Sequence, residues 1–293
     1  MAMPAVRNVM NLDPTKKYVA APLRRVRLAC SGPERGGRTH FACTAPDPTV
    51  ILSYDPGTTR TATKFAHRQI HVERRLFSVP PEDVEAVFDA VSGGGMKAAA
   101  ASPAAKEVMR LADAEYEWFK SAVRQVRADR RIRSLVVDTE THLNYIFKLA
   151  KFGRGFKVMP DMYGPANAEM AFFLNEFELS PDLNVIWLQQ ESDEYTPDRK
   201  DSSGNVQRGE RTGRSKPRGW NQLGYYVDMR TRHTHRGGKL GFEISVADCG
   251  FNPLLAGTSI GGGVTFPELM AEVLPDVPPR TWRGATPVEA EEE

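Results

Sequence analysis

The feature that most constrains the fold is a glycine-rich segment, residues 32–39, which follows a short strand-like run at 25–30. Its spacing is that of the phosphate-binding loop G-x-x-x-x-G-K-[ST], with Arg38 in the place of the usual lysine. Glycines let successive backbone N–H groups curve around a phosphate, and a helix that begins after the loop adds its dipole. We therefore predict a strand, a phosphate loop and a helix that opens at His40 and ends near Pro46.

Within this segment, individual side chains have expected roles. Thr39 is expected to ligate Mg²⁺, and the basic residue before it to touch the terminal phosphates. Arginine is longer and planar, so Arg38 is expected to preserve nucleotide binding more readily than turnover. Arg35 is either a further phosphate contact or a solvated charge, and the whole segment has an alternative as an ordinary glycine-rich turn. The predicted nucleotide-binding residues are Gly32, Pro33, Glu34, Arg35, Gly36, Gly37, Arg38, Thr39 and His40.

Apolar runs alternate with helical patterns along the rest of the chain. Strands are expected at 49–54, near 69–74, at 132–138 and at 184–189, with helices at 81–91 and 104–129. This alternation predicts an α/β fold with a mostly parallel central sheet flanked by helices, where ligands lie beyond the carboxyl ends of the strands. Runs at 225–232 and 240–246 predict a C-terminal antiparallel hairpin across residues 236–239.

Three polar residues end the predicted strands. Asp138 is expected to hold the magnesium shell, Asp55 to orient or deprotonate an attacking water, and Gln189 to sense a γ-phosphate. Each has a simpler alternative. Asp138 suits a helix N-cap, Asp55 a turn, and Gln189 an ordinary polar strand end. Thr39 and Asp138 together form the predicted metal site.

Composition limits the class of protein. With 293 residues and 41% hydrophobic content, the chain can bury one large core. The net charge is only +2, so any affinity for nucleic acid must come from local clusters. The three cysteines, Cys30, Cys43 and Cys249, do not form a disulfide framework, and no apolar run is long enough for a membrane span. We expect a cytoplasmic protein with an N-terminal arm (1–24), one domain (25–275) and an acidic tail (276–293).

One cluster of charge follows Gln189. Residues 199–218 hold seven basic and two acidic side chains among Ser and Gly, which predicts a flexible loop, with Trp220 as a stacking surface. A second basic segment lies at 151–157. The alternative is a solvated insertion. The predicted contacts to single-stranded DNA are Arg154, Lys157, Arg208, Arg211, Arg214, Lys216 and Arg218.

Four segments in order, SGPERGGRTHFA, ILSYDPGT, SLVVDTET and NVIWLQQ, resemble the successive core strands of RecA-like P-loop ATPases. The likeness is to the phage-encoded single-strand annealing and recombination group of AAA-type ATP-binding proteins, and it spans about residues 24–270. It implies that the loop binds ATP with Mg²⁺, that Asp138 is the Walker B acid, and that Asp55 stands at the catalytic carboxylate. Here Arg38 replaces a lysine, and Asp55 a common glutamate.

The same resemblance implies the partners. Gln189 would link the nucleotide state to DNA, and the loop after it would contact single-stranded DNA. Copies of the chain would assemble side by side into a homo-oligomer, with a single-strand-binding protein as a further partner, in the cytoplasm of the host if the protein is phage-encoded. Separately, Trp118, Trp187 and Phe172 are expected in the core, and His233 and His235 on one strand face without a third metal ligand.

Overall fold

The computed structural model describes residues 25–78, 103–152, 163–197, 199–200, 206–207, 209–235 and 242–282. Several predictions fall outside these residues. They are the arm at 1–24, the helix at 81–91, the turn at 236–239, the end of the tail beyond residue 282, and the DNA contacts Arg154, Lys157 and Arg208.

A nine-stranded sheet forms the centre of the fold, in the order β11-β10-β9-β1-β5-β4-β2-β3 with β8 beside β5. The strands from β9 to β3 in this order are parallel to their neighbours, whereas β10, β11 and β8 pair in antiparallel fashion. The predicted mostly parallel sheet with an antiparallel C-terminal hairpin is therefore confirmed. The strands are β1 (Arg27–Gly32), β2 (Thr49–Ser53), β3 (Ile70–Arg74), β4 (Ser134–Asp138), β5 (Asn184–Tyr195), β8 (Arg211–Arg218), β9 (Met229–His235), β10 (Phe242–Cys249) and β11 (Ser259–Ile260).

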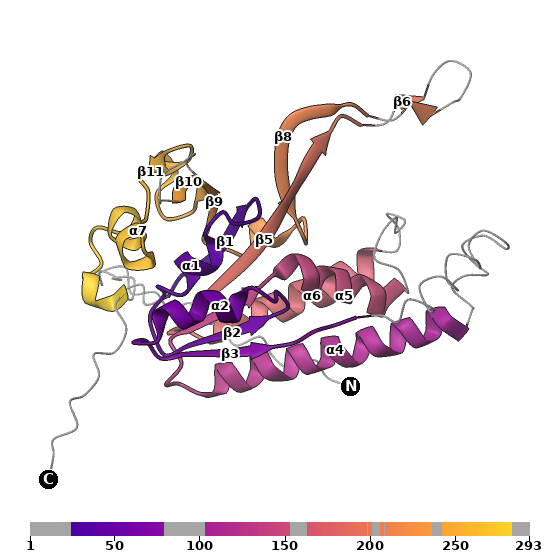
Figure 1. Cartoon of the computed structure of the whole chain (residues 1–293), viewed down its shortest axis with the longest axis horizontal. Coiled ribbons are helices and arrows are strands. Elements are labelled where there is room, and N and C mark those ends of the chain that lie inside the picture. Colours follow the sequence, from indigo (N-terminus) through magenta and orange to yellow (C-terminus); the bar gives the residue numbers. More distant parts are fainter. Residues whose placement is uncertain are drawn as a thin grey trace, which may run out of the picture.

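Helices cover both faces of this sheet (Figure 1). On one face, α4 (Pro103–Ala128), α5 (Glu140–Phe152) and α6 (Tyr163–Asn175) enclose one buried apolar cluster. On the other face, α1 (Arg38–Ala42), α2 (Thr58–Ala62) and α7 (Phe266–Val273) contribute to a second cluster. Short 3-10 helices complete the fold: η1 (Thr63–Phe65), η3 (Glu176–Leu179), η4 (Leu223–Tyr225), η5 (Pro253–Leu255) and η6 (Pro279–Trp282).

The long amphipathic helix predicted at 104–129 is confirmed as α4. Its apolar row faces the core, and Glu115, the polar member of that row, is buried against Arg75 at 2.8 Å. Trp187 is buried as predicted, and Trp118 is partly buried. Phe172 is a correction, because 71% of its surface is exposed on α6. Its neighbours Met170, Phe173 and Leu174 fill the inward face instead, so the apolar run is wider than the buried stripe.

The folded region also extends into the segment expected as tail. Trp282 in η6 is fully buried, and its ring lies 6.3 Å from that of Phe266 in α7. The side chain of Trp282 therefore packs against α7. Within the described part of the chain, no helix combines the length and the apolar character that crossing a membrane requires.

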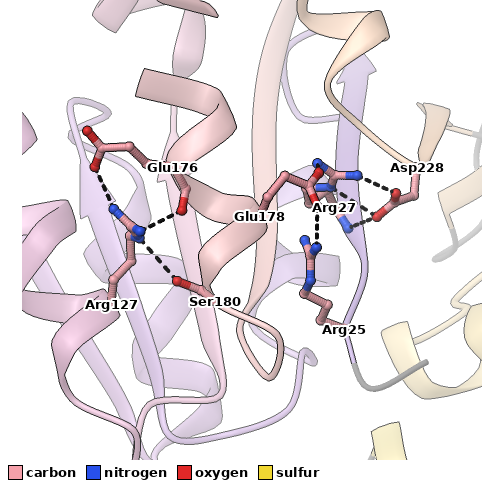
Figure 2. Close-up of polar contacts among 7 residues, drawn as sticks. All are labelled: Arg25, Arg27, Arg127, Glu176, Glu178, Ser180 and Asp228. Carbon is pink, nitrogen blue, oxygen red and sulfur yellow. Dashed lines mark hydrogen bonds and ion pairs between the residues drawn. The ribbon is translucent and has the colours of Figure 1, made fainter. Parts of the chain in front are cut away.

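Ion pairs join the elements near the start of β1 (Figure 2). Arg27 bonds Asp228, just before β9, at 2.8 Å, and it also pairs with Glu178 of η3. Arg127, near the end of α4, bonds Glu176 of η3 at 2.5 Å. The Arg27 contacts lie at the amino ends of β1 and β9, so they stabilise the end of the sheet opposite residues 32–39.

Candidate functional site

The predicted strand, loop and short helix are present. β1 ends at Gly32, residues 33–37 form the turn, and α1 begins at Arg38. Arg35 has a φ of 59° and Gly37 a φ of 84°, both in the left-handed region. Phe41 N donates to Gly37 O at 2.9 Å, so the helix begins directly after the turn and its amino end faces the loop. This geometry suits an anion.

The loop rests on the backbone of β9. A Cβ atom on Gly32 would lie 2.3 Å from the His233 carbonyl oxygen, and one on Gly36 would lie 3.0 Å from the same atom. Both positions therefore need glycine because a backbone group is too close for a side chain. His233 itself is buried, and burial lowers its pKa to about 3, so it supports the loop as a neutral side chain.

A cavity of about 490 Å³ opens beside this loop, within the size range of small-molecule sites. Four cationic side chains face two carboxylates around it, which makes the cavity suited to a polyanion. The predicted site included neither the residues that α2 and η1 contribute to this lining nor Gln190 of β5. The lining residues are Glu34, Arg35, Gly36, Gly37, Arg38, Thr39, His40, Asp55, Gly57, Arg60, Thr61, Lys64 and Gln190.

Asp138 lies where the prediction requires it, at the end of β4 and almost fully buried. The Thr39 hydroxyl donates to its Oδ2 atom at 3.0 Å, and the Thr58 hydroxyl donates to the same atom at 2.6 Å. The pKa of Asp138 is raised to about 6, chiefly by burial and also by nearby Asp55, although the hydrogen bonds from the two hydroxyls act in the opposite direction. The structure thus brings together the loop threonine and a carboxylate 99 positions away.

These oxygen donors fit a magnesium ion. Mg²⁺ prefers oxygen ligands and keeps several waters, so a hydroxyl and one carboxylate beside a phosphate site are a sufficient protein contribution. A buried carboxylate also has an electrostatic reason to take up a cation, because burial without one disfavours its charged form. No group of three or more His, Cys, Asp or Glu side chains suited to a metal occurs among the described residues.

Asp55 makes the turn contact that was considered for it, and it also lines the cavity. Its Oδ1 atom accepts a hydrogen bond from Gly57 N at 2.6 Å, which is the turn contact. The residue is half-buried and also lines the cavity. A carboxylate held by a turn at the mouth of a phosphate site is placed to receive a proton from water.

Arg38 is the departure from the motif, and its side chain is buried at the cavity wall. Its Nη1 atom donates to the backbone carbonyl of Gln189, at the end of the apolar part of β5. Burial lowers the pKa of Arg38, and the nearby carboxylate of Asp138 opposes that shift. The guanidinium is therefore anchored on β5 while it lines the cavity.

The side chain of Gln189 does not line the cavity. Its Nε2 atom donates to Glu140 Oε2 at 2.9 Å on the α5 side of the sheet. The next residue, Gln190, lines the cavity instead. Successive strand residues point to opposite faces, so a shift of one position exchanges the two glutamines. Period-two alternation from Leu188, which packs in the cluster on the α1 side, was the signal that could have identified Gln190.

Glu140 connects this strand end to the segment after β8. It is buried, and its Oε1 atom accepts a hydrogen bond from Trp220 N at 2.9 Å. Burial raises the pKa of Glu140 to about 7, against the hydrogen bonds from Gln189 and Trp220. Gly219 leaves room for this carboxylate, because a Cβ atom there would lie 1.8 Å from Glu140 Oε2 and would displace it.

The pH dependence of stability tests this description of Glu140. Its folded-state pKa lies above the ordinary value of 4.5, so the folded state binds more protons than the unfolded state between about pH 4.5 and 7. The free energy of unfolding should therefore fall as pH rises through this window, by up to about 1.4 kcal/mol per pH unit. In Glu140→Gln, urea unfolding at pH 5, 6, 7 and 8 should show a shallower fall. Equal slopes in both proteins would contradict the description.

The basic segment after Gln189 is a β-ribbon, which corrects the predicted flexible loop for residues 211–218. β5 continues to Tyr195 and pairs with β8, and the two strands extend away from the body of the domain (Figure 1). The short pair β6 (Arg199–Lys200) and β7 (Val206–Gln207) forms a separate ladder. Backbone pairing stabilises such a ribbon whatever its side chains, so its polar sequence carried no strand pattern.

Some charged side chains of the ribbon form ion pairs, and others are exposed. Arg211 pairs with Asp193 at 2.5 Å. Glu191 joins the root of the ribbon to the sheet through Arg232 at 2.8 Å and Ser215 at 2.7 Å. Arg214, Lys216 and Arg218 are exposed. Trp220 is a correction, because it is buried, with its indole N–H donating to Asn167 at 3.0 Å, and so it offers no stacking surface.

Comparisons with known proteins give only distant likenesses, all of them to solved structures. No family model matches the sequence, and no curated protein matches it. Among solved structures, the crystal structure of the RadB recombinase is similar, with 15% identity and a TM-score of 0.35. The match covers 80% of this chain and 86% of that one. At this distance we base the function on the site itself.

Proposed function

We propose that this chain is a RecA-like nucleotide-binding protein that holds ATP with Mg²⁺ at the loop of residues 32–39. The observation that carries the proposal is the contact between the Thr39 hydroxyl and Asp138 at 3.0 Å, beside a cavity with a cationic lining. A loop built to surround a phosphate, a hydroxyl and a buried carboxylate are the parts that phosphoryl-transfer sites require. Bound magnesium would neutralise charge that develops on the terminal phosphates.

The residues of this chain would divide the remaining work. The backbone of the loop holds the phosphates, and Asp55 positions a water and accepts its proton. Gln190, which lines the cavity, takes the part of contact to the terminal phosphate that the sequence suggested for Gln189. Gln189 supports this residue from the opposite face of the sheet, where its Nε2 atom donates to Glu140 Oε2 at 2.9 Å.

We further propose that the ribbon binds single-stranded DNA. Arg218 and Lys216 lie opposite Gln190 and Ser192 in the ladder, so all four share one ribbon face. This face begins at the cavity, because Gln190 lines it. Two exposed cations one strand repeat apart, about 7 Å, suit the backbone of an extended strand. A homo-oligomer on DNA that promotes recombination or annealing, as in phage-type proteins, is the activity this arrangement would serve.

A second candidate function is a nucleotide-binding scaffold without turnover. The bond from Arg38 to the Gln189 carbonyl favours it, because a guanidinium anchored on β5 is not free to follow a transferring phosphate. A lysine side chain at position 38 would be shorter than arginine and would carry its charge on one compact ammonium group.

One experiment separates these functions. Retention of a fluorescent oligo-dT strand on a filter should rise when the Mg²⁺ complex of AMP-PNP is added, and should fall steeply with salt, because phosphate contacts release counterions. ATPase rates of the wild type and Arg38→Lys are measured alongside. A wild type with turnover comparable to that of the variant supports the ATPase. Little native turnover with a gain of tenfold or more in Arg38→Lys, about 1.4 kcal/mol, supports the scaffold. No retention at any salt concentration would refute the DNA part.

A further inference from the structure

The cavity has a cationic wall that lies outside the phosphate loop. Arg60 of α2 and Lys64 of η1 line it, together with Thr61. Positions four apart on a helical segment share a face, so the two cations project on the same side. Nothing in the motif at residues 32–39 specifies this wall, because it comes from the segment after β2.

Hydrogen bonds fix this wall beside the metal position. Thr58, the first residue of α2, donates to Asp138 Oδ2 at 2.6 Å, the atom that also accepts from Thr39. Ser53, at the end of β2, donates to the Thr58 hydroxyl at 2.8 Å. The start of α2 is thus tied to the carboxylate that faces the loop, and the position of the wall relative to the loop is set by these bonds.

Ring packing holds the far end of the wall. The rings of His40 in α1 and Phe65 in η1 lie 4.8 Å apart, edge to face. Burial lowers the pKa of His40, and the charge of Lys64 lowers it further, so Lys64 and His40 lie close together. Both residues line the cavity. The helix that follows the phosphate loop and the segment that bears the cations therefore form one continuous surface.

This placement assigns the wall to a particular part of a nucleotide. The backbone of a phosphate loop surrounds the inner phosphates, and the metal bridges the outer two. Because Thr58 of α2 donates to Asp138, the cations of α2 and η1 would lie at the outer end of a bound phosphate chain. A lysine at position 38 would contact that end of the phosphate chain, but the Arg38 side chain donates to the Gln189 carbonyl instead.

We propose that Arg60 and Lys64 bind the terminal phosphate and make the site selective for a nucleoside triphosphate over a diphosphate. The inference rests on the proposed nucleotide site. It adds to that proposal that two side chains outside the loop, and not the loop itself, distinguish a triphosphate from a diphosphate.

Calorimetric titration of AMP-PNP and of ADP, both with Mg²⁺, tests this assignment. The variants are Arg60→Ala/Lys64→Ala and a matched control, Lys106→Ala/Arg110→Ala, which removes an exposed lysine and arginine at the same spacing from α4. The α2 variant should bind AMP-PNP about 10- to 100-fold more weakly, since each lost contact to a charged group is substantial, and ADP with less than about a threefold change. The control should bind both as the wild type does.

The outcomes separate the inference from the function beneath it. An equal loss for AMP-PNP and ADP in the α2 variant would overturn the assignment, because the cations would then act only through general attraction. Unchanged affinity for both ligands would also overturn it, while leaving the nucleotide site intact. A wild type that binds neither ligand would overturn both. Thermal unfolding of each variant confirms that the folded state is kept, and Arg60→Lys/Lys64→Arg should restore most of the selectivity.

Discussion

Replacing Gly32 by alanine is expected to abolish nucleotide binding and to destabilise the domain. The new Cβ atom would lie 2.3 Å from the His233 carbonyl oxygen, a distance at which something must move. The obstacle is backbone in β9, which pairs with β1 from Leu28 to Ser31, so it cannot rotate away like a flexible side chain. Overpacking of this kind costs roughly 1–3 kcal/mol, and the loop would be displaced with it.

Urea unfolding and calorimetric titration with AMP-PNP measure the two effects. Gly261→Ala is the matched control, because nothing lies within 4 Å of a Cβ atom at that position. The control should match the wild type in both measurements. If Gly32→Ala bound AMP-PNP with wild-type affinity, the loop would not be the nucleotide site.

The second large effect is expected from Asp138→Asn, and it should act on binding without weakening the fold. The side chain keeps its shape but loses the charge that faces Thr39 at 3.0 Å. Mg²⁺-dependent affinity for AMP-PNP should fall by about 100-fold, equivalent to about 2.7 kcal/mol. Removal of a charged acceptor from a metal position accounts for a loss of this size.

The stability of this variant follows from the pKa of Asp138. Burial raises that pKa from 3.8 to about 6, so the ionised carboxyl disfavours the folded state, and the penalty is complete above pH 6. At pH 7.5, Asp138→Asn should therefore be at least as stable to urea as the wild type. Asp129→Asn, in an exposed turn with Arg131, is the control for charge and should leave AMP-PNP binding unchanged. A clear loss of stability in Asp138→Asn would make Asp138 a structural residue instead.

Several elements were predictable because their signals are local. The loop at residues 32–39 follows from the spacing of its glycines, and α4 from apolar residues three and four positions apart. Asp138 was identified because a strand that is buried on both faces rarely ends in a carboxylate without a partner. Even so, its partner Thr58 was not predicted, because no motif marks Thr58 and the contact joins residues 80 positions apart.

Other features depend on strand register and tertiary packing. Gln189 and Gln190 are adjacent and chemically identical, and only the register of β5 in the sheet decides which one lines the cavity. The polar strand β8 has no apolar pattern, because its partner is the backbone of β5. Trp220 has the composition of a DNA-stacking residue, yet Asn167 and the core enclose it.

The sequence by itself determined the glycine-rich loop at residues 32–39, the order of the strands along the chain and the acid that ends β4, because spacing and periodicity are properties of neighbouring residues. The tertiary structure alone decided that Arg38 lies on the Gln189 carbonyl and that Arg60 and Lys64 complete the cavity. Those placements come from strand order and helix packing, which bring side chains from three separate segments to one edge of the sheet. No sequence pattern within any one of these segments predicts these placements.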